Sequence, residues 1–477
     1  MQRNDRHPAL WLALGALLLV ASQMRFGLGV FAWIAPVPWL RYLRVTTGWK
    51  SRVGFGGALF AAWTLATLKI ITAPLLPVFS VLFSLPMALA LGLPFAGWAF
   101  VRRRLGEDAA TLAFPALMVA GEWVLHGLLP FGTWGSAANT QVDQLALLQL
   151  GSVTGMHGVS FLVYASAVLE RLLGDARASA RKPAMVTATA VIGALAFGQA
   201  RLTAASAETV PTRLVAAIGT DSTVGSEPDL PDAARLAADE QGLVRRTEQA
   251  ARSGAELVVW NEAATMVHPE DEDAWIRRIQ ELATRLSIDL VAAYVVPLQV
   301  EPVFYENKYV FVRRDGTIDH AYFKHQPVPG ESAVKGTDPM PRTTDAYGTL
   351  GGAICYDYDF PRIALANAGV DLVALPSSDW RGIDPIHTQM AALRAIENGH
   401  SIVRSTRFGL SAGIDPWGRI RGWLSAHDGD NRVLVVSLPQ RGVTTIYGRL
   451  GDWFPLLCGL GGLGLLGFAM RSAIMRR

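Results

Sequence analysis

The most informative run of this sequence is Leu350-Gly-Gly-Ala-Ile-Cys355-Tyr-Asp-Tyr-Asp-Phe-Pro361. Its apolar first half predicts a buried strand that stops at Cys355. A polar turn follows, and then a helix from Pro361, because proline is favoured in the first helical turn. We expect a side chain at such a corner to be exposed at the sheet edge. Amides from Tyr356 onward can point at a developing oxyanion. Cys355 is therefore a candidate nucleophile, provided that a base and a positive field lie near it.

Two other predicted strand ends supply those groups. The apolar run Leu257-Val-Val-Trp-Asn-Glu262 ends in a glutamate, and Tyr322-Phe-Lys324 places a lysine just before a Pro/Gly-rich loop that runs to Glu331. A surface salt bridge is the simpler interpretation of either residue alone. Glu, Lys and Cys in this order, each at the end of a strand, form a much more specific pattern.

The region around these residues, 201–452, is predicted to be an α/β domain large enough to bury a full core. We expect short buried strands at 214–218, 257–260, 290–295, 308–312, 350–354, 372–375, 402–404 and 433–437. Helical spacing occupies 232–252, 271–286 and 385–399, and the Ser-, Gly-, Pro- and Asp-containing segment 221–231 is predicted to be a loop.

Cysteine usage favours a chemical role for Cys355. The chain has 2 cysteines, and the other, Cys458, falls within an apolar run near the end of the sequence. The two are not expected to meet, so we predict no disulfide. A free cysteine is most often a small buried core residue, and this reading stays open for Cys355 on the cysteine count alone.

Composition divides the chain into unlike parts. Hydrophobic residues make up 51% and charged residues 17%, against roughly 25% charged in soluble domains. This excludes a disordered chain, a disulfide scaffold and an ordinary cytosolic enzyme, and the net charge of +3 is too small to indicate a nucleic-acid partner. Apolar runs predict membrane spans at 9–24, 27–40, 54–72, 76–100, 110–128, 157–173, 183–200 and 453–470.

Eight spans give a bundle of about seven in residues 1–200 and a single helix with a tail in 453–477. The first span is predicted to be a retained anchor rather than a cleaved signal peptide, and Pro36 and Pro38 could break or tilt the second. Basic residues gather before the first span, after the second, fourth and sixth, and at the end of the chain, at positions 3, 6, 41–52, 102–104, 171–182 and 471–477. Positively charged loops stay cytoplasmic. Both termini are therefore predicted to be cytoplasmic, with 201–452 on the other side of the membrane.

The Glu-Lys-Cys pattern resembles the nitrilase superfamily, whose αββα sandwich carries such a triad. With many spans before this domain and one after it, the chain resembles the apolipoprotein N-acyltransferase family within that superfamily. The resemblance implies that Glu262 is the general base, that Lys324 stabilises the oxyanion and that Cys355 is the nucleophile. It also matches Glu331 to the family's second glutamate. Further matching segments are Pro130–Gly135, Glu122, His387–Glu397 and Val403–Thr406.

Some positions depart from the family pattern. Asn261 replaces a proline, Asp357 replaces a glutamate, Ser378–Trp380 is a shortened segment and Arg407–Gly409 replaces Asn-Asn-Gly. Only 31 positions separate Lys324 from Cys355, where the family usually has a longer insertion that forms a mobile arm. The triad itself is intact. We expect Glu331, Tyr356, Trp380 and His387 to support the site or to bind substrate.

The resemblance implies a bacterial inner-membrane acyltransferase whose catalytic domain faces the periplasm. It would move an acyl chain from a phospholipid, through a cysteine thioester, to the N-terminal amine of a diacylglyceryl-cysteine lipoprotein, and it calls for no cofactor. The alternative is a membrane-anchored nitrilase-like amidase or hydrolase that uses water as the acceptor. A third class, a non-enzymatic sensor or transporter, is disfavoured by the intact triad.

Other patterns are weaker. His325, His387 and His400 lack the spacing of a metal site. The acidic run 270–273 lacks the spaced ligands of a calcium loop, and no glycine-rich phosphate loop precedes a helix. Glu122 could be functional or could serve helix packing, while Trp123, Trp134 and Trp453 lie near predicted membrane interfaces, where tryptophan anchors helices.

Overall fold

The computed structural model of the protein describes residues 7–174, 177–207, 210–224 and 231–475. The basic residues at positions 3, 6, 476 and 477, and most of the predicted loop 221–231, lie outside the described residues. The chain forms two compact units. One consists of Met1–Ala204 with Leu450–Arg477, and the other consists of Ala205–Arg449.

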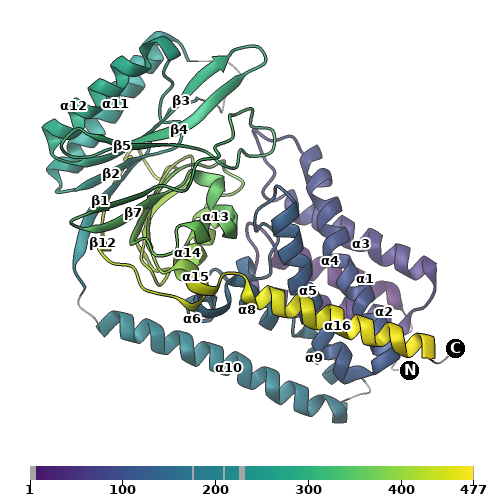
Figure 1. Cartoon of the computed structure of the whole chain (residues 1–477). Helices are drawn as coiled ribbons and strands as arrows, with labels where there is room; N and C mark the ends of the chain where they lie inside the picture. The colour runs from purple at the N-terminus through teal and green to yellow at the C-terminus, as the bar shows by residue number, and fades with distance from the viewer. Residues whose placement is uncertain (1–6, 175–176, 208–209, 225–230, 476–477) are drawn as a thin grey trace. The chain divides into compact units, whose positions relative to one another are not determined.

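The first unit is helical (Figure 1). Its elements are α1 (Pro8–Ser22), η2 (Gly29–Trp33), α2 (Pro36–Val45), α3 (Trp49–Thr67), α4 (Val78–Leu105), α5 (Glu107–Leu128), η3 (Ala138–Gln141), α6 (Leu145–Leu148), α7 (Gly151–Thr154), α8 (Met156–Val163), α9 (Ser166–Leu173), α10 (Arg177–Ala207) and α16 (Trp453–Met475). Among the described residues, five helical segments are long and apolar enough to cross a membrane: Val78–Leu105, Glu107–Leu128, Met156–Leu173, Ser179–Ser206 and Trp453–Met475.

These five segments are fewer than the eight spans that the sequence predicts. The helix α1, at 15 residues, is shorter than a membrane crossing needs. Residues 27–40 do not form one helix either, because a 3₁₀ turn precedes α2, which starts at Pro36. Arg44 on α2 forms ion pairs with Glu107 and Glu170, at 2.6 and 2.5 Å. These ion pairs connect α2 to the start of α5 and to α9.

Hydrogen bonds within the helical unit hold the side chains of Glu122, Trp123 and Trp453. The buried Glu122 carboxylate accepts hydrogen bonds from the Ser136 hydroxyl (3.0 Å), the Ala137 amide (2.7 Å) and the Tyr164 hydroxyl (2.7 Å). These contacts tie α5 to the segment before η3 and to the end of α8, which favours the helix-packing interpretation. The indole N–H of Trp123 donates to Asp452, and that of Trp453 donates to the Val153 carbonyl, each at 2.9 Å.

The second unit contains two six-stranded sheets. One has the strand order β12-β1-β2-β3-β4-β5 and the other β11-β10-β9-β8-β7-β6. The strands are β1 (Thr212–Ile218), β2 (Leu257–Trp260), β3 (Asp289–Gln299), β4 (Phe304–Val312), β5 (Ile318–Phe323), β6 (Arg342–Asp345), β7 (Gly348–Gly352), β8 (Leu372–Ser378), β9 (Ser401–Arg407), β10 (Leu410–Ile414), β11 (Ile420–Ser425) and β12 (Val433–Pro439).

Helices cover the outer faces of the two sheets (Figure 1). Residues of α11 (Ala233–Arg252) and α12 (Glu272–Leu286) pack on the first sheet, while η5 (Cys355–Asp359), α13 (Pro361–Ala366) and α14 (Ile386–Asn398) cover the second. The inner faces share a third core, to which Val259, Tyr309 and Phe311 contribute from one sheet and Leu350 and Val403 from the other. The short helices η4 (Pro269–Asp271) and α15 (Ile446–Leu450) complete the unit. The predicted αββα sandwich is confirmed.

Strands β6, β10 and β11 were not predicted, and β5 was expected only as the strand end just before Lys324. Three of these four strands are edge strands of their sheets. An edge strand has one neighbour and carries more polar residues, as in Arg342-Thr-Thr-Asp345, so its hydrophobic pattern is weak. The β10 strand holds only five residues, one of them Gly413.

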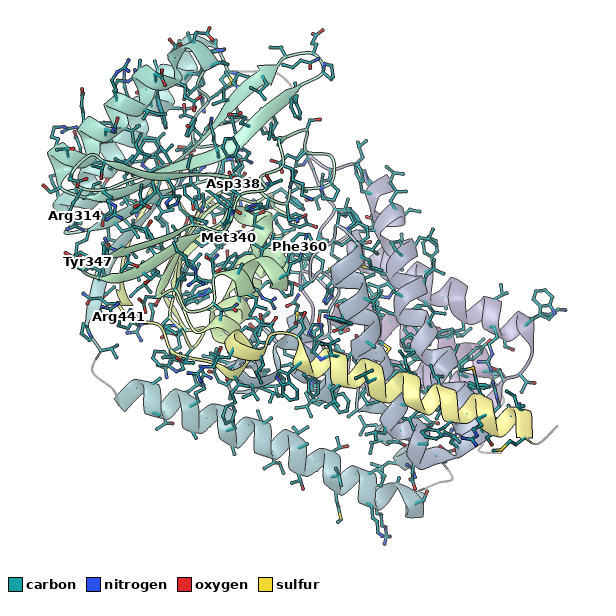
Figure 2. The ribbon with its side chains drawn as sticks, in the orientation of Figure 1. Arg314, Asp338, Met340, Tyr347, Phe360 and Arg441 are labelled. Atoms are coloured by element: carbon teal, nitrogen blue, oxygen red, sulfur yellow. The ribbon has the colours of Figure 1, made fainter. Side chains whose placement is uncertain are left out.

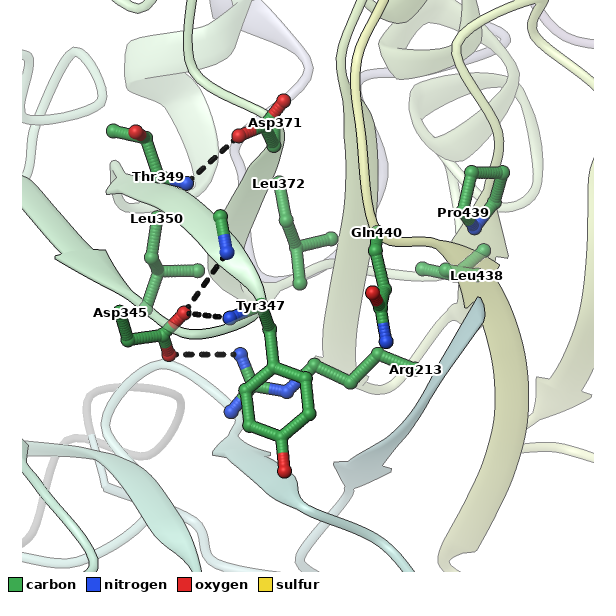
Figure 3. Close-up of a pocket in the computed structure, with 11 residues that line it drawn as sticks. Arg213, Asp345, Tyr347, Thr349, Leu350, Asp371, Leu372, Leu438, Pro439 and Gln440 are labelled. Carbon is green, nitrogen blue, oxygen red and sulfur yellow. Dashed lines mark hydrogen bonds and ion pairs between the residues drawn. The ribbon is translucent and has the colours of Figure 1, made fainter. Parts of the chain in front are cut away.

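An ion pair ties the two sheets together away from the strand ends that carry the candidate residues. Arg213 of β1 reaches Asp345 of β6 at 3.4 Å and lies over the ring of Tyr347, 4.3 Å from its centre. Figure 3 shows these side chains around a pocket of about 10 Å³. This volume holds at most one water molecule. The pocket is therefore a feature of sheet packing rather than a substrate site.

Candidate active site

Cys355 lies at a tight corner after β7. The strand ends at Gly352, two residues earlier than the predicted end, and Cys355 begins the 3₁₀ helix η5 with a left-handed backbone (φ 47°). This conformation is uncommon for a residue with a side chain, and residues that adopt it are enriched at active sites. The prediction that Cys355 is exposed is wrong: it is 4% exposed and belongs to the core between the sheets. The reason is that this end of β7 faces the other sheet rather than solvent.

Glu262, Lys324 and Glu331 lie together at the ends of first-sheet strands. Glu262 follows β2 by two residues, and Lys324 directly follows β5. The Lys324 ammonium donates to Glu262 Oε1 and to Glu331 Oε2, each at 2.7 Å. Lys324 and Glu262 are both buried. The structure thus brings three of the predicted site residues into one hydrogen-bonded group.

Asn307, on β4, completes this group and was not singled out from the sequence. Its side-chain amide donates to Glu262 Oε1 at 2.7 Å and to Glu331 Oε1 at 2.9 Å, while its main-chain carbonyl accepts from the Lys324 amide at 2.9 Å. Its Oδ1 atom is buried without a hydrogen-bond partner among the described residues. The two hydrogen bonds from Asn307 Nδ2 to the carboxylates of Glu262 and Glu331 therefore fix the orientation of this side chain.

The charges of the group favour a cationic lysine and a neutral thiol. Burial opposes the charged form of Lys324, but Glu262 and Glu331 raise its pKa well above the ordinary value. Burial would also raise the pKa of Glu331, but Lys324, Asn307 and the Val328 amide lower it. Burial raises the pKa of the Cys355 thiol well above its ordinary value. Glu262 adds to that rise, and Lys324 opposes it. A resting thiol of this kind needs a base to become a nucleophile.

Asp357 connects the segment that carries Cys355 to the segment that carries Lys324. Its buried carboxylate accepts from the Ile354 amide (3.0 Å), from the Gln326 amide (2.6 Å) and from the Tyr322 hydroxyl (2.9 Å). Ile354 precedes Cys355, and Gln326 follows Lys324 by two residues. Burial raises the pKa of Asp357 to about 7, although its hydrogen bonds act in the opposite direction.

The short segment between Lys324 and Cys355 is bound to the domain. The hairpin of β6 and β7 occupies its second part, and residues 325–341 form the loop before it. His325 Nε2 lies 2.9 Å from the Asp338 carbonyl, and the Tyr322 hydroxyl lies 3.7 Å from Met340 Sδ. Figure 2 labels Asp338 and Met340, together with Phe360 at the start of α13. This loop is thus anchored at several points close to the candidate site.

His387 lies in a second charged cluster beside Cys355. Its Nδ1 is 2.7 Å from Asp379, and its Nε2 is 2.9 Å from Asp359. Arg404 donates to both oxygens of Asp379, at 2.7 and 3.0 Å. Burial would lower the pKa of His387, but the two aspartates raise it to about 9. Burial opposes the charged form of Asp379 as well, yet Arg404 and His387 lower its pKa.

This cluster contains the residue types of a metal site, but His387 and Asp379 have no lone pairs left to bind a metal ion. One ligand atom each from Cys355, Asp379 and His387 lies within 4.8 Å of the others. A protonated histidine offers donors on both ring nitrogens, and the Arg404 guanidinium already occupies the carboxylate. We therefore interpret the group as a charge network around the thiol and assign no metal to it.

Two further predicted residues flank the site. Tyr356, directly after the candidate nucleophile, is buried, and its ring meets Phe360 edge to face with centres 5.3 Å apart. Trp380 is half-buried and follows Asp379, and its carbonyl accepts from the Ile383 amide at 3.0 Å. Cys458 lies in α16 of the helical unit, and neither cysteine is in a disulfide, as predicted.

Comparisons with known proteins cover both units. The family model of the apolipoprotein N-acyltransferase N-terminal domain matches residues 15–169, and that of carbon-nitrogen hydrolase matches residues 214–445. The apolipoprotein N-acyltransferase of Caulobacter vibrioides is 27% identical over 445 residues, which cover 85% of this chain and 82% of the relative. The apolipoprotein N-acyltransferase of Geobacter metallireducens is 27% identical over an alignment of 514 positions, gaps included, which covers 98% of this chain and 96% of the relative.

Among solved structures, an amidase from Nesterenkonia sp. is similar at a TM-score of 0.40 and 23% identity, over 48% of this chain and 91% of the amidase. The family matches follow the structural division, since one falls in the helical unit and the other in the αββα unit. Both units of the chain therefore match domains of apolipoprotein N-acyltransferases, and the αββα unit matches the carbon-nitrogen hydrolase model.

Proposed function

We propose that the protein is a lipoprotein N-acyltransferase that works through a thioester on Cys355. It takes an acyl chain from a membrane phospholipid and transfers it to the N-terminal amine of a diacylglyceryl-cysteine lipoprotein. One observation carries the chemical part of this proposal. A buried lysine is held between two glutamates, and Cys355 lies buried on a left-handed corner where the charges of Glu262 and Lys324 shift the pKa of its thiol. The relatives are named apolipoprotein N-acyltransferases, which supports a lipoprotein amine as the acyl acceptor.

In the first half of the reaction, Cys355 Sγ attacks the ester carbonyl carbon of the phospholipid while Glu262 takes the thiol proton. The Lys324 ammonium and the amide that follows Cys355 face the oxyanion of the tetrahedral intermediate. When the intermediate collapses, the C–O bond breaks and the lysophospholipid leaves with the proton held by Glu262. The acyl group remains on Cys355 as a thioester. Glu331 and Asn307 keep Lys324 and Glu262 in position.

In the second half, the amine nitrogen attacks the thioester carbonyl, and Glu262 accepts a proton from it. The C–S bond then breaks, the amide product leaves, and the Cys355 thiolate recovers its proton. A covalent intermediate divides one difficult acyl transfer into two easier steps. The same base serves both steps, so loss of Glu262 is expected to slow each of them.

The membrane-length helices support a reaction at a membrane, where both proposed lipid substrates would reside. Each buried CH₂ group contributes about 0.8 kcal/mol to lipid anchoring, so a two-chain lipid rarely leaves the bilayer. We propose that the enzyme resides in the bacterial inner membrane with both termini in the cytoplasm and the αββα unit in the periplasm. This orientation needs an even number of crossings, so we propose that the 19-residue helix α3 crosses the membrane in addition to the five segments given above. The basic residues at 41–52, 102–104 and 171–182 support this orientation.

The test is a two-step assay on the purified full-length protein. Incubation with phospholipid labelled in its acyl chain should give a labelled Cys355 peptide, and a diacylated lipopeptide should then remove the label as an N-acyl product. Cys355→Ala should abolish both signals. Cys458→Ala, which removes the other thiol, should leave both unchanged.

Release of labelled free fatty acid without transfer would favour the hydrolase alternative, in which water is the acceptor. No labelled enzyme with any acyl donor would contradict both enzymatic readings and leave a sensor or transporter. The matches to an acyltransferase N-terminal domain and to acyltransferase relatives favour transfer over hydrolysis.

A further inference from the structure

The helical unit contains an apolar cavity of about 810 Å³ between α5, α7, α8, α10 and α16. All of its lining residues belong to the unit formed by Met1–Ala204 and Leu450–Arg477, so none is shared with the unit that holds Cys355. Its volume falls within the range of small-molecule binding sites, roughly 300–1,000 Å³.

The walls of the cavity exclude a charged or strongly polar occupant. Thr154 and Cys458 are the lining residues with a side-chain heteroatom, and the others are aliphatic residues, phenylalanine or glycine. The Thr154 hydroxyl already donates to the Leu150 carbonyl one turn back, at 3.1 Å. Large apolar cavities stay dry, because water in them would lack hydrogen-bond partners. Only an apolar group can fill this space.

The position of the cavity identifies the source of that group. Four of the five membrane-length segments line the cavity, namely α5, α10, α16 and the segment Met156–Leu173, which contains α8. Two lining side chains, Phe197 on α10 and Leu457 on α16, are 41% and 56% exposed. The cavity is therefore continuous with the surface of these helices, and that surface faces lipid in a membrane.

The cavity exists because small residues line two of its helices. Ala190, Gly193 and Ala194 on α10 and Gly461 on α16 all line the cavity. Small residues normally let membrane helices pack in direct contact. Here a Cβ atom at Gly193 or Gly461 would meet no atom within 4 Å. The walls of an empty cavity would forfeit dispersion contacts, which a flexible hydrocarbon chain would restore.

We propose that this cavity binds a hydrocarbon chain of a membrane phospholipid. The site is built by the helical unit alone and does not depend on acyl transfer at Cys355. Binding is decided by shape and dispersion, so a leucine that fills the cavity should displace the chain without unfolding the bundle. Gly193→Leu and Gly461→Leu meet this condition, since both positions have free space around them.

The experiment uses the full-length protein in vesicles of phosphatidylethanolamine that carries a photoreactive diazirine near the end of one acyl chain. After irradiation, the labelled peptides are identified by mass spectrometry. We expect label on the cavity faces of α5, α8, α10 and α16, and at least a fivefold loss of that label in the Gly193→Leu/Gly461→Leu double variant. Gly464→Leu and Gly467→Leu, which also have free space on α16 but do not line the cavity, should label as the unmodified protein does.

Equal labelling of the double variant and the unmodified protein would overturn the proposal. The proposal would also be overturned if native mass spectrometry showed a dimer and the helices around the cavity carried no label. A second copy of the chain would then fill the cavity in place of lipid. If the double variant does not fold, Ala190→Leu narrows the same cavity from an exposed position on α10 and must give the same loss of label.

Discussion

Replacing Asn307 with leucine tests whether the group around Lys324 acts as a unit. Leucine has a similar size but no N–H, so Glu262 and Glu331 would each lose one donor, at 2.7 and 2.9 Å, while both keep Lys324. A hydrogen bond to a charged group contributes about 1.5–3 kcal/mol. If the bond to Glu262 alone governs the attack of the thiol, the rate should fall roughly tenfold to 150-fold, because about 1.4 kcal/mol corresponds to a factor of ten.

The assay is single-turnover formation of the labelled Cys355 peptide from labelled phospholipid, followed in time. The matched control is Asn398→Leu, which removes another buried amide whose donor reaches the Arg394 carbonyl at 3.0 Å within α14. Its rate of labelling should stay close to that of the unmodified protein. A labelling rate for Asn307→Leu within about threefold of the unmodified protein would refute the reasoning, provided that thermal unfolding shows both variants to be folded.

Three further predictions use other parts of the site. His387 has its pKa raised from 6.5 to about 9. Its stabilising contribution is therefore full below pH 6.5 and is lost as the pH rises through about 9. The difference in melting temperature between the unmodified protein and His387→Gln should be large at about pH 6 and small at about pH 10, and a difference independent of pH would contradict this. Gly352→Ala should slow labelling of Cys355, because the new Cβ would lie 1.9 Å from the Tyr309 hydroxyl. Adding Tyr309→Phe should restore part of the rate, and an unchanged rate in Gly352→Ala alone would exclude the clash. Asp357 has its pKa raised to about 7, and its carboxylate form accepts all three of its hydrogen bonds. Labelling should slow as the pH falls through 7, and Asp357→Asn should flatten that step in the pH profile, whereas an unaltered step would assign it to another group.

The residue pattern predicted an α/β domain because its central strands are buried on both faces, and the αββα arrangement was implied by the family resemblance. Runs such as Leu257–Trp260 and Leu372–Leu375 are continuously apolar, and they recur between helical patterns. Glu262 and Cys355 were detectable for the same reason, since each closely follows such a run, whereas Lys324 follows the mixed edge strand β5 and was singled out by its place before a Pro/Gly-rich loop. Edge strands such as β6 and β11 lack this signal, and they were missed.

Asn307 and the burial of Cys355 could not be predicted from local pattern. Asn307 lies within Phe304–Val312 as one polar residue among several, and only the antiparallel pairing of β4 with β5 brings it next to Lys324. Burial of Cys355 depends on the second sheet packing against the first. The position of Asn307 beside Lys324 and the burial of Cys355 both depend on tertiary structure, which the local sequence pattern does not predict. The 27–40 region is not one helix, and its break before Pro36 is the one that Pro36 and Pro38 indicated in the sequence.

The three proposed catalytic residues come from two different sheets, so catalysis by them is a property of the interface between the sheets. Glu262 and Lys324 are carried by the first sheet and Cys355 by the second, so no single element fixes their separation. A small slide of one sheet over the other would misalign thiol and base while leaving both sheets intact. Substitutions deep in the shared core, far from any substrate, should therefore slow the enzyme before they unfold it. On gradual heating, activity should decline at temperatures where the secondary structure still persists.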